Sequence, residues 1–252
     1  MENVKSIAVI SDIHGNYTAL KNALRKIEMM DEEISDIMCL GDLVGYNPEP
    51  EQCVNKIKEV CTEVIAGNHD KAMVDELNIE WFRQSVKKSI TWTRSKLSDD
   101  SKKYLKSLNT REDIVINDNK IILAHGSPNQ NSPFSYIFNR YDIKGIEPLI
   151  MDTTILFIGH THIPFCFCNK GEGWFQIEDD EIEINPEYNY IVNVGSVGQP
   201  RDRDPRSSFV VYNPNTKLLK FKRYEYNIKE VQEKFTQTDL PEEFSARLAQ
   251  GR

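Results

Sequence analysis

Val64-Ile65-Ala66-Gly67-Asn68-His69-Asp70 is the stretch on which the prediction of the fold rests. Its apolar run has the composition of a buried strand, and the glycine after it permits a sharp turn at the strand end. The next three side chains would then project from the rim of a sheet. Asn68 offers an amide oxygen, His69 a proton near neutral pH, and Asp70 a carboxylate that can orient the imidazole. Taken alone, the stretch fits a simple turn with a capping Asn and a solvated His better.

Four other apolar runs end in a similar way, and this repetition changes the interpretation. They are Ile7–Ile10, Ile37–Leu40, Ile121–Ala124 and Ile155–Ile158, followed by Ser11-Asp12-Ile13-His14, Gly41-Asp42, His125-Gly126 and Gly159-His160-Thr161-His162. Each run has the length and composition of a buried strand. In open α/β sheets, ligands bind at the carboxyl ends of the strands. All five histidines of the chain follow such runs, so independent structural roles for them are hard to defend.

The strand ends together resemble the signature of the calcineurin-like metallophosphoesterases. The elements that carry the resemblance are, in order, Asp12-x-His14, Gly41-Asp42, Gly67-Asn68-His69-Asp70, His125 and Gly159-His160-x-His162. They agree with that family in ligand identity, in order and in strand context. The resemblance implies an α/β fold, a four-layer α/β/β/α sandwich of two mixed sheets.

The resemblance also implies a binuclear metal site and a role for each residue. One divalent ion would take Asp12, His14, Asp42 and His162, and the other Asp42, Asn68, His125 and His160, with Asp42 as the bridge. A hydroxide between the ions would attack a small phosphomonoester or phosphodiester. His69 would protonate the leaving oxygen as general acid, and Asp70 would fix the imidazole. Mn, Fe, Zn or Ni would suit such borderline ligands, and the sequence does not choose among them.

The loop Gly195–Arg206 is a second candidate region, for substrate binding. Ser196 and free backbone N–H groups after a strand, with the guanidinium of Arg201, would suit a phosphate. An exposed loop with Arg–Asp pairs such as Arg203–Asp204 explains the same residues. Prokaryotic relatives in the family have a similar Gly-Ser-Val-Gly-Gln-Pro-Arg loop, which favours a function. Tyr46, in the loop after Asp42, either borders the site or packs in the core.

Composition excludes several classes of function. The 252 residues carry a net charge of −8, which argues against extended nucleic acid or an anionic membrane as partner. No apolar run reaches the ~20 residues of a membrane helix, and we expect no signal peptide. Five cysteines without a CxxC pair favour free thiols in a reducing cytosol, and Cys166-x-Cys168 lacks the partners of a zinc site. We expect a cytoplasmic protein that binds a small phosphate ester; a homo-oligomer remains open.

The order of elements predicts one domain over residues 1–252. We expect helices over 17–30 and up to residue 61, with Asn16 as an N-cap, and a helical insertion at about 71–110. In that insertion Trp81, Phe82, Val86, Ile90 and Trp92 recur at helical spacing. A loop over 126–139, long enough to be functional rather than a plain connection, would precede a helix over 141–151. The short strands after residue 162 are interpreted as an antiparallel second sheet stacked on the first, before a helical tail at about 227–252.

Other functions also remain open. A catalytically silent scaffold of the same fold is disfavoured by the intact His69-Asp70 pair. Protein serine/threonine phosphatases of the family have Asp-Arg-Gly after the bridging Asp motif and Glu after the His, where this chain has Val44-Gly45-Tyr46 and Asp70. A dinucleoside-polyphosphate hydrolase or a nuclease is a further alternative, with extended polynucleotides disfavoured by charge.

Overall fold

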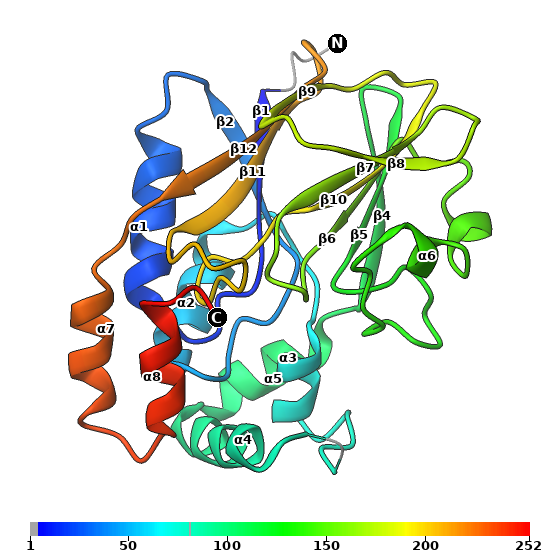
Figure 1. Cartoon of the computed structure of the whole chain (residues 1–252). Coiled ribbons are helices and arrows are strands. Elements are labelled where there is room, and N and C mark those ends of the chain that lie inside the picture. Colours follow the sequence, from blue (N-terminus) through cyan, green and yellow to red (C-terminus); the bar gives the residue numbers. More distant parts are fainter. Residues whose placement is uncertain (1–4, 81) are drawn as a thin grey trace.

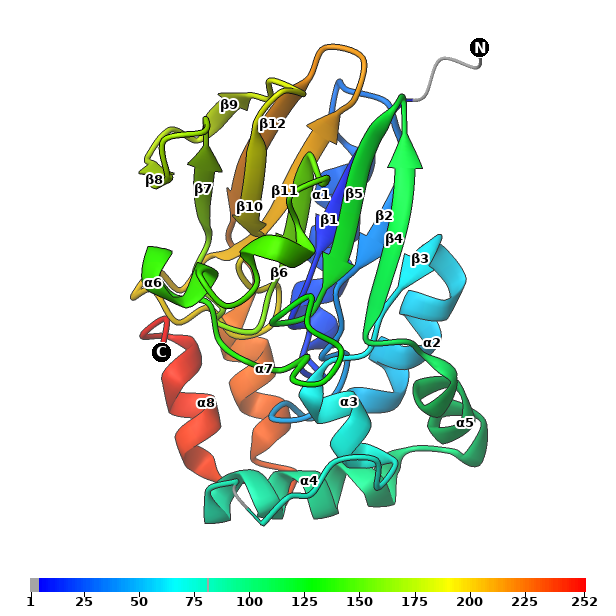
Figure 2. The same ribbon diagram turned by 90° about the vertical axis from the view of Figure 1, so that its right-hand side faces the viewer.

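Two six-stranded sheets lie at the centre of the computed structural model, which describes residues 5–80 and 82–252 (Figure 1). The first sheet has the order β3 (Glu63–Val64), β2 (Ile34–Cys39), β1 (Ser6–Ile10), β11 (Ser207–Asn213), β12 (Leu218–Tyr224) and β9 (Glu181–Glu183). The second has the order β4 (Arg111–Ile116), β5 (Asn119–Ala124), β6 (Ile155–Ile158), β10 (Asn189–Asn193), β7 (Phe165–Asn169) and β8 (Trp174–Ile177). The two sheets face each other across an apolar core, as Figure 2 shows from the side.

Each sheet contains a parallel half that positions the site. Strands β1, β2 and β3 are mutually parallel in the first sheet, and β5, β6 and β10 in the second. The remaining pairings are antiparallel, so both sheets are mixed, as predicted. All the histidine-containing motifs follow the parallel strands at their carboxyl ends. This edge is where ligands bind in α/β sheets.

The strands after residue 162 do not form a sheet of their own, so that part of the prediction is wrong. Strand β11 pairs with β1, with Val9 opposite Val210, and β10 pairs with β6, with Ile191 opposite Leu156. The C-terminal strands are therefore divided between both sheets. The residues of β10 and β11 are almost all buried, and such strands need neighbours on both edges and cover on both faces.

Helices surround the sheets. They are α1 (Tyr17–Glu28), α2 (Pro50–Val60), α3 (Asn68–Met73), α4 (Gln84–Lys96), α5 (Asp99–Ser107), α6 (Arg140–Ile143), α7 (Ile228–Phe235) and α8 (Glu242–Leu248), with a 3-10 turn η1 (Glu147–Leu149). The Asn16 side chain accepts from the Ala19 N–H, which confirms the predicted N-cap. The insertion at 71–110 and the tail are helical, as predicted, although Trp81 lies outside the described residues. The helix expected over 141–151 is reduced to α6 and η1, because Gly145 and Pro148 disfavour a continuous helix.

Alternating side chains of the strands build three apolar layers. Ile7 and Val9 face the second sheet, whereas Ala8 and Ile10 face the helices that cover the first. The outer face of the second sheet is covered by the segment of α6 and η1. The α/β/β/α sandwich is therefore confirmed, with a thick helical layer on one side and a thin one on the other.

Two further features concern the cysteines and the membrane. All five cysteines are unpaired. Cys166 and Cys168 both face the apolar space between the sheets, and the possible metal-ligand groups among residues 5–80 and 82–252 contain no cysteine. Over the same residues, none of the helices combines the length and the apolar character needed to cross a bilayer.

Candidate metal centre

The strand ends bring the predicted ligands into two adjoining groups. Asp12, His14, Asp42 and His162 form the first, and Asp42, His125 and His160 form the second. Within each group the possible donor atoms lie within 4.8 Å of one another, and all these residues are buried. Asp42 belongs to both groups, which is the arrangement that a bridging carboxylate requires.

The two oxygens of Asp42 have different partners. Its Oδ1 accepts a hydrogen bond from the backbone N–H of His69 at 2.8 Å. Its Oδ2 lies 3.4 Å from His14 Nε2 and 3.3 Å from His125 Nε2. A single carboxylate oxygen therefore faces one histidine of each group.

Asp12 is oriented in the same manner. Its Oδ2 accepts from the backbone N–H of His160 at 3.0 Å. Its Oδ1 is buried without a hydrogen-bond partner and lies 3.1 Å from His162 Nε2. The backbone thus holds one oxygen of each aspartate and leaves the other directed at the histidines.

Each of the four histidines in the two groups places one ring nitrogen against a backbone carbonyl. The pairs are His14 Nδ1 with Val44 O at 3.2 Å, His125 Nδ1 with Leu40 O at 2.7 Å, His162 Nδ1 with Gln199 O at 2.6 Å, and His160 Nε2 with Phe134 O at 3.0 Å. An imidazole that donates one N–H in this way keeps a lone pair on its other nitrogen, as metal-ligating histidines do.

The donor atoms fit cations. The Nε2 atoms of His14 and His162 are 3.1 Å apart, and two lone pairs at that distance repel unless positive charge lies between them. The Oδ1 of Asn68 is buried without a hydrogen-bond partner. Unsatisfied buried acceptors are costly, and a bound ion satisfies them. Imidazole, carboxylate and amide donors together suit borderline divalent ions.

Burial and charge set the protonation of the cluster. Burial lowers the pKa of His160 to about 3, aided by the charge of His125, and burial lowers the pKa of His162 to about 4, aided by Arg201. Burial would also lower the pKa of His125, but the carboxylates of Asp42 and Asp12 raise it to about 9. Neutral His160 and His162 are in the form that binds metal, whereas His125 would release a proton on binding.

The backbone around the cluster is strained. The ligands with positive φ are Asp12 (54°), His14 (50°), Asp42 (51°), His160 (65°) and His162 (62°). Non-glycine residues rarely adopt this region, at a cost of about 1–2 kcal/mol each, and such strain clusters at functional sites.

Two glycines make room for the aspartates. A Cβ on Gly67 would lie 2.1 Å from Asp42 Oδ1, and a Cβ on Gly159 would lie 2.5 Å from Asp12 Oδ2. Gly67 has an ordinary φ of −89°, so the close approach of Asp42, rather than an unusual turn, requires glycine there.

Comparison with known proteins identifies the family. A model of the calcineurin-like phosphoesterase superfamily domain matches residues 6–217. The chain belongs to this superfamily. An uncharacterized protein of Methanocaldococcus jannaschii is 34% identical over 250 residues, which are 99% of this chain and 100% of the relative. The crystal structure of a metallophosphoesterase from Sphaerobacter thermophilus has 33% identity and a TM-score of 0.82, covering 99% of this chain and 100% of that one. A hypothetical protein from Pyrococcus horikoshii shares the fold at 23% identity, with a TM-score of 0.80 and 98% of each chain covered.

In this member of the superfamily, His69 lies beside the cluster without joining either ligand group. The centroid of its ring is 4.8 Å from that of His14 and 4.6 Å from that of Tyr46. Its Nδ1 is buried without a partner and packs against Gly45. Burial lowers the pKa of His69 well below its usual value, so the neutral ring is the resting form.

Asp70 does not contact the His69 ring, which corrects the role predicted for it. Its Oδ1 accepts from the backbone N–H of Leu43 at 2.9 Å, and its Oδ2 from that of Gly67 at 2.9 Å. Burial and the nearby Asp42 carboxylate raise the pKa of Asp70 to about 7. The backbone amides of two loops converge on this carboxyl group, which therefore holds the loop of Asp42 against that of Asn68.

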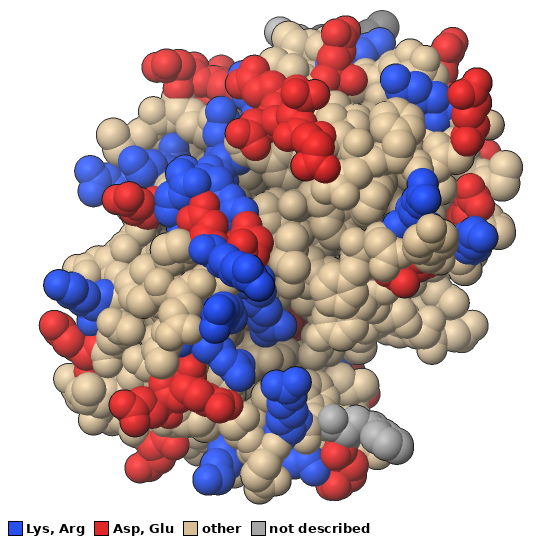
Figure 3. Space-filling view, in the orientation of Figure 1, with Lys and Arg blue, Asp and Glu red and all other residues tan. Residues whose placement is uncertain are grey.

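Arg201 lies over the Tyr46 ring, with 5.5 Å from its guanidinium carbon to the ring centroid. Figure 3 shows Lys and Arg side chains in a band across this face of the molecule, interrupted by Asp and Glu. Arg206 pairs with Asp204, and Arg223 with Asp202. Arg201 differs, since it forms no ion pair with any residue of 5–80 or 82–252 and its charge acts on His162 and His69.

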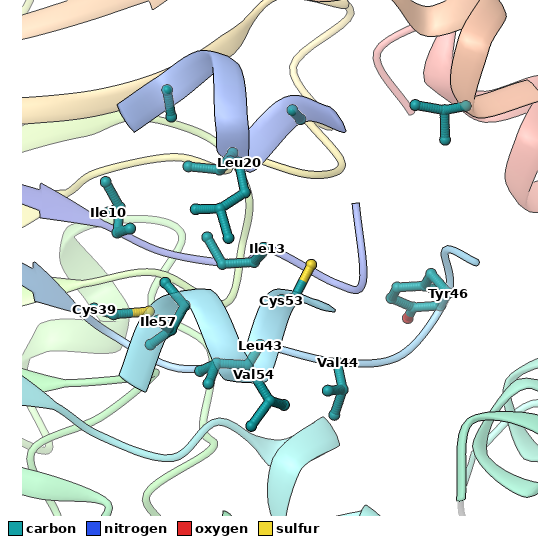
Figure 4. Packing of buried hydrophobic residues seen from close by; sticks show 14 of the residues in the cluster. Ile10, Ile13, Leu20, Cys39, Leu43, Val44, Tyr46, Cys53, Val54 and Ile57 are labelled. Atoms are coloured by element: carbon teal, nitrogen blue, oxygen red, sulfur yellow. The ribbon is translucent and has the colours of Figure 1, made fainter. Parts of the chain in front are cut away.

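Tyr46 lies between the cluster and the C-terminal helix. It stands at the edge of the apolar cluster in Figure 4, with Val44 beside it. Its ring is 4.6 Å from that of His14 and 4.8 Å from that of Phe244 in α8. Burial raises the pKa of its phenol, against the charge and hydrogen bond of Arg201. Tyr46 thus borders the site as well as packing in the core.

Ser196 does not line the site, contrary to the prediction for it. It is fully buried. Its hydroxyl donates to the Asp12 carbonyl at 2.8 Å and accepts from the Gln199 N–H at 2.8 Å. Because backbone groups occupy the hydroxyl both as donor and as acceptor, Ser196 positions Asp12 rather than a substrate.

The length of the loop over 126–139 indicated a function, but the sequence singled out none of its residues. The carbonyl of Phe134 fixes the His160 ring, and Tyr136 stacks on that ring. A backbone carbonyl leaves no signal in a sequence. The alternation Phe134-x-Tyr136-x-Phe138 in a polar loop was the available signal.

Proposed function

We propose that this member of the superfamily hydrolyses a small phosphomonoester or phosphodiester with the help of two divalent cations. The observation that carries the proposal is the position of Asp42 Oδ2, 3.4 Å from His14 Nε2 and 3.3 Å from His125 Nε2. One oxygen shared by two groups of buried donors is expected of a two-metal site.

The proposed ligands follow from the buried donors. Asp12, His14, Asp42 and His162 would hold one cation, and Asp42, Asn68, His125 and His160 the other. When bound, the cations supply positive charge to the phosphate and an activated nucleophile. The aspartates and histidines contribute by holding their donor atoms in place through backbone hydrogen bonds, so that little reorganisation is needed.

His69 is the proposed general acid. Its Nδ1 is enclosed beside Gly45, so we assign the transferred proton to Nε2. Burial keeps the free ring neutral, since it lowers the pKa of His69. An anionic phosphate ester beside the ring would raise that pKa again and favour the imidazolium that can protonate a leaving oxygen.

Arg201 is the proposed substrate anchor. Its guanidinium lies over Tyr46 and acts electrostatically on His69 and His162. A guanidinium without a carboxylate partner can form paired hydrogen bonds with a phosphate. Tyr46 would orient it through the ring contact.

The proposal also covers the domain organisation, the compartment and the partners of the protein. We propose a single domain over residues 1–252 that acts in the cytoplasm on a small ester, without a membrane or extended nucleic acid as partner. The five unpaired cysteines suit a reducing compartment. The net charge of −8 disfavours anionic polymers and surfaces.

The test is a panel of monoesters, diesters and nucleotides, assayed with protein stripped of metal and then reloaded with Mn²⁺. We expect hydrolysis of at least one class after reloading and none after stripping. Asp42→Ala should be inactive under both conditions. A protein that binds two ions and hydrolyses nothing would contradict the proposal and support a catalytically silent scaffold.

A further inference from the structure

The turn that follows α8 closes against the loop over 195–206. The backbone N–H of Arg203 donates to the carbonyl of Gly251 at 2.8 Å. Gly251 is buried, although it belongs to a short turn over 249–251. In Figures 1 and 2 this turn lies beside the loop between β10 and β11. Two segments far apart in the sequence therefore meet through a direct backbone contact.

Two features of Gly251 require glycine at that position. Its φ is +59°, in the left-handed region that favours glycine. A Cβ on it would lie 2.6 Å from the backbone nitrogen of Asp204 and 2.7 Å from the carbonyl carbon of the same residue. Because these neighbours are backbone atoms, a side chain at position 251 would displace the main chain of the loop.

The displaced segment would be the one that presents Arg201. The backbone N–H of Arg201 donates to the carbonyl of His162 at 3.3 Å, and two residues later Arg203 is held by Gly251. Arg203 has a φ of +69°, which non-glycine residues rarely adopt. Such a conformation persists only where the surrounding structure enforces it. The contact with Gly251 is part of that enforcement.

Helix α8 also supports the ring on which the Arg201 guanidinium lies. Phe244 of α8 is fully buried, and its ring centroid lies 4.8 Å from that of Tyr46, with 66° between the planes. The Tyr46 centroid in turn lies 5.5 Å from the guanidinium carbon of Arg201. The backbone of the Arg201 loop and the ring under its side chain are thus both held by residues 242–251.

We propose that residues 242–251 are a positioning element for the Arg201 guanidinium, acting through Gly251 on the loop and through Phe244 on the ring. The inference rests on the proposed function, because it concerns the proposed phosphate anchor of that site. Paired hydrogen bonds from a guanidinium to a phosphate depend on alignment, so a displaced loop weakens them. Neither side chain can bind a metal, and the cations should therefore stay in place when either residue is changed.

The experiment measures the binding of inorganic phosphate to the Mn²⁺-loaded protein by calorimetry, together with the metal content after dialysis. Arg201→Ala should lower the phosphate affinity by about tenfold, the loss expected for one charge-assisted hydrogen bond. Gly251→Ala should lower it by about 3- to 10-fold, because displacement of the loop weakens or removes the same contact. Both variants should retain as much Mn²⁺ as the wild-type protein. With any ester that the wild-type protein hydrolyses, KM should rise by a similar factor with little change in kcat.

A double-mutant cycle separates positioning from a general loss of stability. In the Arg201→Ala background, Gly251→Ala should lower the phosphate affinity by less than about twofold, because the group that it positions is absent. Gly171→Ala, in the turn between β7 and β8, is the matched control. It also places alanine at a positive φ, of +95°, but no atom lies within 4 Å of the added Cβ. This control should leave the phosphate affinity unchanged.

Phe244→Leu tests the ring contact without straining the backbone, and it provides the test if Gly251→Ala does not fold. It should lower the phosphate affinity by about 2- to 5-fold, within the range for one aromatic contact, and only when Arg201 is present. Phe235→Leu in α7 removes a buried ring from the same apolar cluster and is the control for this variant.

The possible results distinguish the positioning role from the proposed function. Wild-type phosphate affinity in Arg201→Ala or in the folded variants of Gly251 and Phe244 would overturn the positioning role. Equal losses with and without Arg201, or a loss of Mn²⁺ that accompanies the loss of phosphate, would overturn it as well. Ester hydrolysis alongside any of these results would leave the proposed function standing alone. Phosphate binding that depends on Gly251 only when Arg201 is present, in a protein that hydrolyses no ester, would support the positioning role and contradict the phosphoesterase function.

Discussion

The ligand cluster and the aromatic loop meet at His160, yet they are built in opposite ways. In the cluster every donor residue is buried, and backbone groups hold the second atom of each aspartate and histidine. In the loop, the side chains of Tyr136 and Phe138 stand about half exposed and stack on each other and on His160. The cluster uses strand ends, whereas the stack uses a connection without regular structure.

This difference separates a rigid part of the molecule from an exposed part that can vary. Donors fixed by a sheet need little rearrangement to hold a cation, and strain at their backbone is compensated by the surrounding hydrogen bonds. Exposed loop residues can change without disturbing those donors, as is usual for binding residues on a rigid scaffold. Substitutions at the cluster should therefore have far larger effects than substitutions at the rim.

The largest effect is expected at Asp42. Asp42→Ala removes the oxygen that faces both groups, so both ions should be lost on dialysis. Substitution of a residue that only hydrogen-bonds to a metal ligand lowers metal affinity by about 10- to 100-fold, and the loss of a bridging ligand should lower it further. His14→Ala should mainly weaken the group that contains Asp12 and His162. Metal analysis after dialysis distinguishes the two variants. Two tightly held ions in Asp42→Ala would exclude a bridging role.

The next effect is expected at His69, which binds no metal in this account. His69→Asn should retain the ions and reduce the rate by about 10²- to 10⁴-fold, the usual contribution of general acid catalysis. The loss should be smallest for nitrophenyl esters, whose leaving group needs little protonation, and largest for alkyl esters. Rates at matched metal content across a series of leaving groups test this. An equal decrease in rate for every leaving group would show that His69 is not the general acid.

A smaller effect, on stability, is expected at Asp70. Asp70→Asn puts an amide group opposite the N–H of Leu43 or Gly67, and an unsatisfied buried donor costs about 1–3 kcal/mol. Because folding raises the pKa of Asp70 to about 7, wild type loses stability as the pH rises through 7 and Asp70→Asn does not, so denaturant unfolding should show the loss in the variant at pH 5 and a smaller loss, or none, at pH 8. Asp100→Asn, at an exposed position, is the control. If Asp70→Asn instead changed only the leaving-group dependence of the rate, the carboxyl would act through His69 after all.

The smallest effect is expected at Arg201, which is half-buried beside the cluster. Arg201→Ala should raise KM by about tenfold, the value of one charge-assisted hydrogen bond of about 1.4 kcal/mol, with kcat little changed. Arg206→Ala is the matched control, because its guanidinium is engaged by Asp204. Identical kinetics for Arg201→Ala and the wild-type protein would indicate that the loop over 195–206 has only a structural role.

The sequence predicts the buried ligand cluster well and the exposed aromatic loop poorly. Asp12, Asp42 and His125 each follow an apolar run, and the carboxyl ends of parallel strands meet at one edge, so their convergence is readable without coordinates. The family model and the related structures confirm the family and fold. The roles assigned to the individual residues stay predictions.

What the sequence did not reveal depends on contacts between distant segments. The pairing of β1 with β11 joins segments some two hundred residues apart, and a strand's apolar pattern does not say which neighbour it has. Asp70 follows His69 directly, yet its partners are backbone amides at Leu43 and Gly67. The stack of Tyr136 on His160 arises in a loop without periodicity.

The most direct test of the two-cation site is a crystal of the protein grown with Mn²⁺ and examined by anomalous scattering. The account predicts two peaks, one beside Asp12, His14 and His162 and one beside Asn68, His125 and His160, with Asp42 Oδ2 between them. A single peak, or two peaks with Asp42 bound to only one, would contradict the bridging site from which the proposed reaction is derived.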